Sequence, residues 1–190
     1  EMPGCDGSSE AFVRALESAG TVRQPADRRM RIVDRVIFLG NERSWVEARP
    51  PVCSRPVVKY HLDYGHDSPI EAQSRQVVVS PEAFCSELST ARTFLLQEEA
   101  QRLRSQGLGH RTTCADLLVF GPDGPIDNQL RFPDECVRHK LLDLVGDLAL
   151  AGCDLLGHFV AYRSGHSLNA ELVRAIQVEC GMALEHRRCA

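Results

Sequence analysis

The sequence predicts an α+β fold in which a mostly antiparallel sheet packs against amphipathic helices. Four strand-like segments follow one another between residues 30 and 79, separated by short turns, as is typical of antiparallel pairing. In later segments, apolar residues recur at helical spacing. Of the 190 residues, 43% are hydrophobic and 25% are charged, which is ordinary for a globular domain and argues against a disordered chain.

Charge and cysteine content disfavour several classes of protein. The chain carries 22 basic and 26 acidic residues, a net charge of −4, which disfavours general nucleic-acid binding. Its apolar runs fall well short of the ~20 residues that a transmembrane helix needs. The eight cysteines are widely spread and contain no C-x-x-C pair. We therefore expect reduced thiols in a cytoplasmic protein rather than a disulfide scaffold.

The first predicted element is a short helix that follows a turn rich in Gly, Asp and Ser at residues 4–9. Ser8 or Ser9 can cap this helix by accepting a hydrogen bond from its first free N–H groups. Apolar residues recur at helical spacing up to Gly20, which ends the helix. The polar, proline-containing stretch 23–29 is typical of a linker.

The sheet is predicted from four consecutive segments. The β-branched segment Met30–Leu39 ends at the turn Gly40-Asn41, and Ser44–Arg49 returns as its hairpin partner. Val57–Tyr64 and Ser74–Val79 follow, separated by a turn-rich stretch. Strands so close in sequence favour antiparallel pairing.

Two helices and a short strand are predicted next. Ser80-Pro81-Glu82 combines a capping hydroxyl, a proline at the first helical position and an acid, which indicates a helix start. Leu95–Ser105 has the pattern of a second amphipathic helix, which Gly107 ends. Asp116–Phe120 is predicted as a strand.

A longer helix lies between Pro133 and Gly152, with its start near Asp134, because a proline followed by two acids favours a helix N-terminus. Leu155–Tyr162 is predicted as a strand, and Ser167 as the cap of a last helix. The final residues, 181–190, are expected to form a loose tail.

Two side chains of the long helix could bind a metal ion. His139 and Asp143 lie one turn apart and therefore project from the same face, and imidazole nitrogen with carboxylate oxygen suits Zn²⁺. The alternative is a solvated polar face, which is common for such pairs on helices.

Three further residues could take part in proton transfer or charge stabilisation. His166 lies in a Ser-Gly-His turn and could move protons near neutral pH, although a capping or surface histidine also fits. Asp147 could orient His166 or remain a surface acid. The hydroxyl of Thr93 could donate to a developing oxyanion, or Thr93 could simply end a helix.

Four segments together resemble a known family. Residues 137–148 are similar to the metal-binding helix of bacterial UDP-3-O-acyl-N-acetylglucosamine deacetylases, zinc enzymes that commit the lipid A pathway by removing an acetyl group. Residues 161–169 resemble the S-G-H-x-L-N segment of that family, and residues 91–94 its A-R-T-F segment. Asp6-Gly7-Ser8 and the helix after it resemble the end of the family's first domain.

The resemblance implies a role for each candidate residue. His139 and Asp143 would be two of three zinc ligands, and His166 the general acid or the cation that stabilises the tetrahedral intermediate. Asp147 would orient His166, and Thr93 would donate to the oxyanion. The resemblance also implies a UDP-linked acylated glucosamine as substrate, held by six further residues: Lys140, Phe94, Arg49, Asp63, Tyr64 and Arg163.

The resemblance also implies the architecture. It is a two-layer sandwich with helices on one face of the sheet and a β-α-β insert at about 95–119 that forms a passage for the acyl chain. Residues 1–26 would be a remnant of a similar first domain with a linker, 27–180 the second domain and 181–190 a tail. We expect a monomer.

This sequence departs from the family pattern in three places. It contains no H-E-H segment, which in the family supplies the third metal ligand and the general base. We therefore expect an N-terminally truncated piece that is nearly inactive alone. Residues 110–113 replace a frequent glycine pair, which changes the expected shape of the passage, and Tyr64 replaces a more usual phenylalanine.

Two alternatives stay open. The chain could be a non-catalytic module that binds a nucleotide sugar or a lipid, without the base by descent. It could instead be a stand-alone metal hydrolase that uses Glu135 as its base, because Glu135 lies one turn before His139 and could face the same site.

Overall fold

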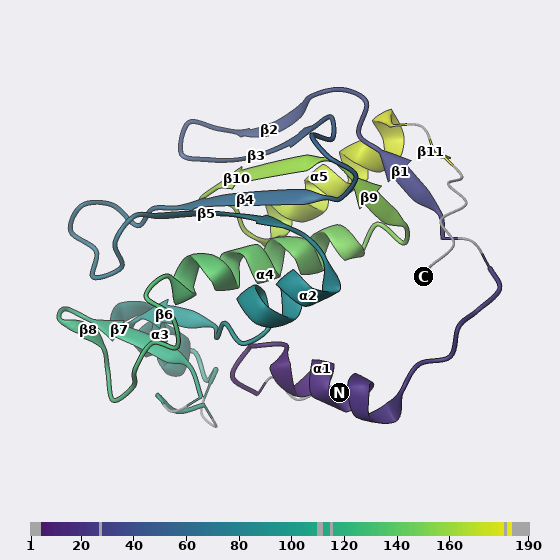
Figure 1. Cartoon of the computed structure of the whole chain (residues 1–190). Helices are drawn as coiled ribbons and strands as arrows, with labels where there is room; N and C mark the ends of the chain where they lie inside the picture. Colours follow the sequence, from purple (N-terminus) through teal and green to yellow (C-terminus); the bar gives the residue numbers. More distant parts are fainter. Residues whose placement is uncertain (1–4, 27, 110–111, 115, 181, 184–190) are drawn as a thin grey trace.

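The computed structural model describes residues 5–26, 28–109, 112–114, 116–180 and 182–183. It has the predicted α+β architecture: a sheet with two long helices, α4 (Glu135–Ala149) and α5 (His166–Glu179), packed on one face (Figure 1). Of the predicted tail, only β11 (Met182–Ala183) is described. His110 and Arg111, where a change in the acyl passage is expected, lie outside the described residues.

The main sheet has five strands in the order β2-β3-β10-β4-β5. Every neighbouring pair is antiparallel except β10 with β4, which are parallel, so the prediction of a mostly antiparallel sheet is confirmed. The strands are β2 (Ile37–Asn41), β3 (Ser44–Arg49), β10 (His158–Tyr162), β4 (Val57–Leu62) and β5 (Gln73–Val78).

Helix α4 lies between the sheet and a second group of elements (Figure 1). On the sheet side, Leu141 and Leu144 are fully buried in the core. On the other side lie α1 (Glu10–Ala19), the short α2 (Pro81–Ala83) and the π-helix η1 (Phe84–Leu88). Ser80 caps α2 as predicted, since its hydroxyl accepts from the backbone N–H of Ala83 at 3.1 Å. Helix α4 is therefore enclosed on more than one side, and its polar face has neighbours.

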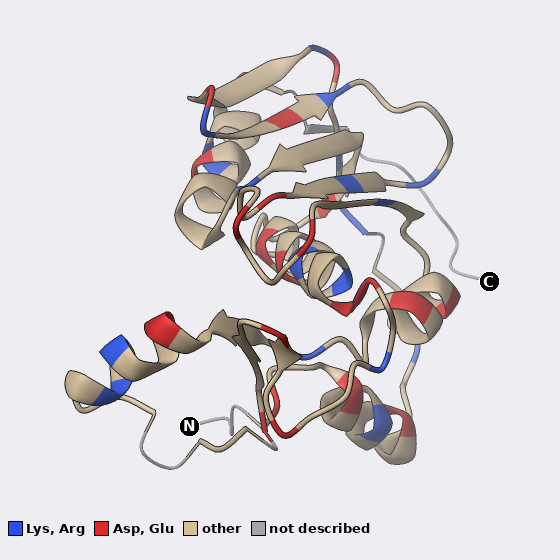
Figure 2. Cartoon of the chain, turned by 90° about the vertical axis from the view of Figure 1, so that its left-hand side faces the viewer, with Lys and Arg blue, Asp and Glu red and all other residues tan. Residues whose placement is uncertain are grey.

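The predicted β-α-β unit is present next to α4. Strands β6 (Phe94–Leu96) and β7 (Leu118–Gly121) are parallel, with α3 (Gln97–Ser105) between them in sequence, and β8 (Gly124–Pro125) pairs with β7. Figure 2 shows that this unit projects away from the main sheet and that α3 carries acidic residues in its first turn and basic residues in its last. Among the described residues, no helix is long and apolar enough to cross a membrane.

Several predicted element boundaries are wrong. Leu95 and Leu96 were expected in a helix but belong to β6, because they pair with Val119 and Phe120. The predicted strand Met30–Leu39 is split into β1 (Met30–Ile32) and β2. Strand β1 lies between β11 and β9 (Asp154–Leu156) in a separate sheet.

The other boundary corrections lie near residue 160. The predicted strand Leu155–Tyr162 breaks at Gly157, where an added Cβ would lie 2.8 Å from the Val33 side chain. Helix α5 begins at His166 with Gly165 as its N-cap, so Ser167 is not the cap.

Candidate active site

Helix α4 brings the predicted metal-ligand pair together. His139 Nε2 lies 3.4 Å from Asp143 Oδ1, and the two side chains are only 8% and 16% exposed. The alternative of a solvated polar face is therefore wrong. Burial lowers the pKa of His139, and this effect outweighs the attraction of Asp143. A neutral imidazole is the form that binds a metal ion.

The backbone fixes the orientation of the His139 ring. Nδ1 lies 3.1 Å from the carbonyl oxygen of Ala91, which can only accept a hydrogen bond. Nδ1 therefore carries the proton and Nε2 keeps its lone pair, the tautomer expected of a metal-binding histidine. The ring of Phe94 packs edge-on against His139, with centroids 6.1 Å apart.

Thr93 reaches His139 from the loop between η1 and β6. Its Oγ1 lies 3.2 Å from His139 Nε2, so the hydroxyl donates to the lone pair of that nitrogen. Lys140 donates from Nζ to the second oxygen of Asp143 at 2.8 Å. A chain of contacts thus links four of the predicted site residues: Thr93, His139, Asp143 and Lys140.

His166, at the start of α5, is paired with Asp147 of α4. Its Nδ1 lies 3.0 and 2.9 Å from the two carboxylate oxygens, as predicted for an orienting acid. The His166 side chain is 71% exposed, whereas Asp147 is 12% exposed. Because Nδ1 faces a carboxylate, the opposite nitrogen, Nε2, is the one that can act on a substrate.

Sequence reasoning missed a residue behind this pair. Asn169 donates from Nδ2 to Asp147 Oδ2 at 2.8 Å and accepts from the Ser164 hydroxyl at 2.9 Å. Both Asn169 and Ser164 are buried. The signal was available, because Asn169 ends the S-G-H-x-L-N segment and lies three residues after His166, on the same helix face.

The other predicted substrate residues are spread over a wider area. Tyr64 packs against Phe94 with ring centroids 5.9 Å apart, which places both beside His139. Asp63 accepts from the Tyr162 hydroxyl at 2.7 Å, and the exposed Arg163 directly follows β10. Arg49 pairs with Glu47 on the face of β3 opposite the core, so the structure does not bring Arg49 to the histidine pair.

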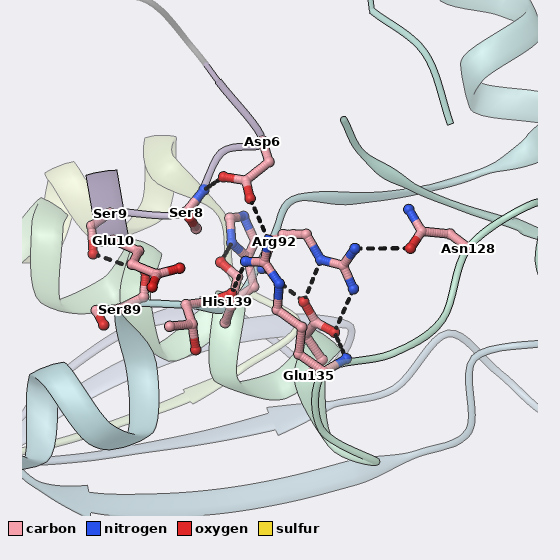
Figure 3. A network of polar contacts seen from close by, with 12 residues as sticks. Asp6, Ser8, Ser9, Glu10, Ser89, Arg92, Asn128, Glu135 and His139 are labelled. Atoms are coloured by element: carbon pink, nitrogen blue, oxygen red, sulfur yellow. Dashed lines mark hydrogen bonds and ion pairs between the residues drawn. The ribbon is translucent and has the colours of Figure 1, made fainter. Parts of the chain in front are cut away.

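Glu135 does not face the site, and the proposal that it could serve as a base is wrong. Its fully buried carboxylate accepts from Arg92 Nε at 2.8 Å and from the backbone N–H of Arg131 at 2.6 Å (Figure 3). Burial alone would raise the pKa of Glu135, but these hydrogen bonds lower it overall. Glu135 is therefore half of a buried ion pair with Arg92.

Two cavities lie near the β-α-β unit. One of about 470 Å³ lies beside Tyr64 and is closed by the turn after β4 and by Leu96, Glu98 and Phe120. The other, about 90 Å³, is mainly apolar and lies inside the unit, where Leu95, Leu103 and Val119 line it. Tyr64 lines the larger cavity and also packs against Phe94, whose ring contacts His139.

The described residues supply two candidate metal ligands and not a full set. No group of three or more His, Cys, Asp and Glu side chains that could hold a metal ion occurs among them. His139 Nε2 and Asp143 Oδ1 fit the nitrogen and oxygen donor set of a zinc site and converge as two ligands, whereas catalytic zinc sites usually have three.

The fold and the site define a class: an α+β protein with a buried histidine–aspartate pair of the kind that can bind a metal ion, and with a second histidine paired to a carboxylate. Such an arrangement suits metal-assisted hydrolysis. The chain belongs to the family of UDP-3-O-acyl N-acetylglycosamine deacetylases (LpxC), whose model matches residues 1–178. The resemblance identified in the sequence is thereby confirmed.

Curated relatives from Brucella ovis, Brucella canis and Brucella melitensis are described as UDP-3-O-acyl-N-acetylglucosamine deacetylases. Each is 40% identical to this chain over 179 residues, which are 93% of this chain and 61% of the relative. The chain thus spans about three fifths of the length of these relatives.

Proposed function

We propose that this chain is part of a zinc-dependent deacetylase that hydrolyses the N-acetyl group of UDP-3-O-(3-hydroxyacyl)-N-acetylglucosamine, the committed step of lipid A biosynthesis. The observation that carries this proposal is the convergence of His139 Nε2 and Asp143 Oδ1, 3.4 Å apart, on the helix that also holds Asp147 against His166. Family membership adds the substrate class.

His139 and Asp143 would hold the zinc ion, which when bound polarises a carbonyl oxygen and lowers the pKa of a water molecule. The lone pair of His139 Nε2 cannot accept from Thr93 and bind a metal ion at once. The Thr93 hydroxyl is then free to donate to the oxygen of the substrate amide as negative charge develops there. His166 donates a proton from Nε2 to the leaving amine nitrogen while Asp147 holds its Nδ1. The oxygen of a water molecule bonds to the amide carbon, and the general base of the intact enzyme accepts the proton that this water loses. The amide C–N bond breaks, and acetate and a free amine are formed.

The substrate would lie along the insert. The cavity of about 470 Å³ beside Tyr64 can take the polar part of a large ligand, and the apolar lining at Leu95, Leu103 and Val119 suits an acyl chain. Lys140 would contact the substrate close to the metal pair.

Seven of the cysteines lie within the described residues and are free thiols, which supports a reducing, cytoplasmic environment.

The third ligand and the general base are assigned to an H-E-H segment like that of the family's first domain, which this sequence does not contain. We therefore expect the chain alone to release acetate at close to the uncatalysed rate. Fusing a first-domain segment from a Brucella relative ahead of Glu1 should give zinc-dependent release. The matched control is the same fusion with His139→Ala, which should be inactive. Full activity of the chain alone, or of the His139→Ala fusion, would contradict the proposal.

The competing function is a binding module for a nucleotide sugar or lipid, favoured by the lack of a three-ligand cluster among the described residues. Calorimetry with the UDP-sugar separates the two. A module binds equally well with and without zinc and is unaffected by His139→Ala. An inactive fusion together with such binding would favour the module.

A further inference from the structure

A glycine in the N-terminal turn lies against Thr93. Gly7 has φ +75°, and a Cβ added to it would lie 1.8 Å from Thr93 Oγ1 and 2.7 Å from Thr93 Cβ. The Thr93 hydroxyl therefore occupies the space that any larger residue at position 7 would need. Only glycine combines this backbone conformation with so close an approach.

This turn is fastened to the body of the protein on both sides of Gly7. The carbonyl oxygen of Asp6 accepts from the backbone N–H of Thr93 at 3.1 Å, and the backbone N–H of Ser9 donates to the Ser89 carbonyl at 2.9 Å. The Asp6 carboxylate accepts from the backbone N–H of Ser8 at 3.0 Å and from Arg131 at 2.8 Å (Figure 3). Partial burial would raise the pKa of Asp6, but the hydrogen bonds from Ser8 and Arg131 lower it overall.

Further hydrogen bonds connect this turn to the site through Arg131. Arg131 also donates to the Thr90 carbonyl at 2.6 Å, and its backbone N–H binds Glu135, the partner of Arg92. The segment that carries Thr93 is thus held from the turn on one side and from α4 on the other. Because Oγ1 rests on Gly7 and Thr93 Cβ is fixed by the backbone, the hydroxyl is kept 3.2 Å from His139 Nε2.

We propose that the turn Asp6–Ser8 positions the Thr93 hydroxyl for the reaction, with Gly7 as the positioning residue that acts through Thr93. The proposal rests on the proposed deacetylase function. The N-terminal turn lies far from the other site residues in sequence. The proposal makes this turn part of the site.

Gly7→Ala tests the contact, and the chain offers a matched control. Gly20 has nearly the same φ, +76°, but an added Cβ there meets no atom of the described residues within 4 Å. Both alanine variants place a side chain at a positive φ, and only Gly7→Ala also displaces Thr93. In the fusion with the first-domain segment, Gly7→Ala should lower kcat by about 10²-fold, the cost of misplacing one oxyanion donor. Gly20→Ala should leave kcat unchanged.

A double-mutant cycle tests whether Gly7→Ala lowers kcat through the Thr93 hydroxyl. In a Thr93→Ala background, Gly7→Ala should cost little further kcat, because the hydroxyl that it displaces is already absent. Additive losses, or equal losses from Gly7→Ala and Gly20→Ala, would overturn the proposal.

A spectroscopic readout does not depend on activity. In ¹⁵N-labelled chain, Gly7→Ala should move the ring Nε2 signal of His139, identified by its loss in His139→Ala, and Gly20→Ala should not. If Gly7→Ala does not fold, Asp6→Ala releases the turn without adding an atom and should move the same signal; an unmoved signal would overturn the proposal. An inactive parent fusion with a Gly7-dependent signal contradicts the deacetylase function and leaves the contact supported.

Discussion

The two histidines of the site are held in opposite ways. His139 lies inside α4 with a side chain that is 8% exposed, and both its ring nitrogens have partners, the Ala91 carbonyl and the Thr93 hydroxyl. His166 begins α5 with a side chain that is 71% exposed, and Asp147 holds it through Nδ1. A metal ligand gains from a fixed, desolvated ring, whereas a group that transfers a proton must reach both solvent and substrate. The difference supports the proposal that the His139 region binds the metal ion and the His166 region transfers the proton.

The largest expected effect separates these two assignments. His139→Ala should reduce the zinc content of the chain to background, because it removes one of the two side chains proposed as zinc ligands. His166→Ala should leave the zinc content unchanged. Metal analysis after dialysis against a limiting zinc concentration measures both. Equal loss of zinc in the two variants would contradict the different roles proposed for the two histidines.

Substitutions near His139 should also lower the free energy of unfolding more than substitutions at the surface. Arg92→Met leaves the fully buried Glu135 carboxylate without its partner and should lower the free energy of unfolding by about 3–5 kcal/mol, measured by urea denaturation. The double variant Arg92→Met, Glu135→Met should recover much of this loss, because no buried charge then remains unpaired.

The control for that loss is the exposed pair Arg14–Glu10 on α1. Arg14→Ala should cost less than about 0.5 kcal/mol, since exposed ion pairs are screened by solvent. A similar loss in Arg14→Ala and Arg92→Met would show that burial of the Arg92–Glu135 pair does not matter for stability.

A smaller effect is expected behind His166. Asn169→Leu removes the donor to Asp147 and the acceptor of the Ser164 hydroxyl, and should destabilise the protein by about 1–3 kcal/mol. In the fusion with the first-domain segment it should also lower kcat, because Asp147 is then less well held against His166. Arg174→Leu, at an exposed position on the same helix, should change neither quantity. A wild-type kcat in Asn169→Leu would show that Asp147 needs no such support.

Local sequence patterns could predict many of the site residues, but not which distant residues contact them. The start of α4 follows from the proline and the two acids at residues 133–135, and the convergence of His139 with Asp143 follows from the helical repeat. The same repeat wrongly placed Glu135 toward the site, because spacing fixes the direction of a side chain only coarsely. It does not reveal the guanidinium of Arg92, which is distant in sequence and binds that carboxylate.

The other errors in the predicted structure arose where residues distant in sequence pair with one another. Leu95 and Leu96 have a helical pattern, yet they form β6 because β7 lies beside them and completes their hydrogen bonds. Likewise, Gly7 could be recognised as part of a turn, but its contact with Thr93 follows only from the packing of the turn against the segment before β6. Contacts between distant segments are decided by the whole fold and leave no local trace.

The smallest expected effect is the pH dependence of the Arg92–Glu135 pair. Burial would raise the pKa of Glu135, but the hydrogen bonds from Arg92 and Arg131 lower it below its ordinary 4.5. The unfolded chain therefore takes up the proton first as the pH falls. The stability due to the pair is fully present well above pH 4.5 and is lost as the pH falls through the lowered value. The difference in unfolding free energy between the wild type and Glu135→Gln should thus shrink below this pH, by less than about 1.4 kcal/mol per pH unit. Urea denaturation at a series of pH values measures it, and a difference that grows in acid would contradict the assignment of an ionised Glu135 to the folded state.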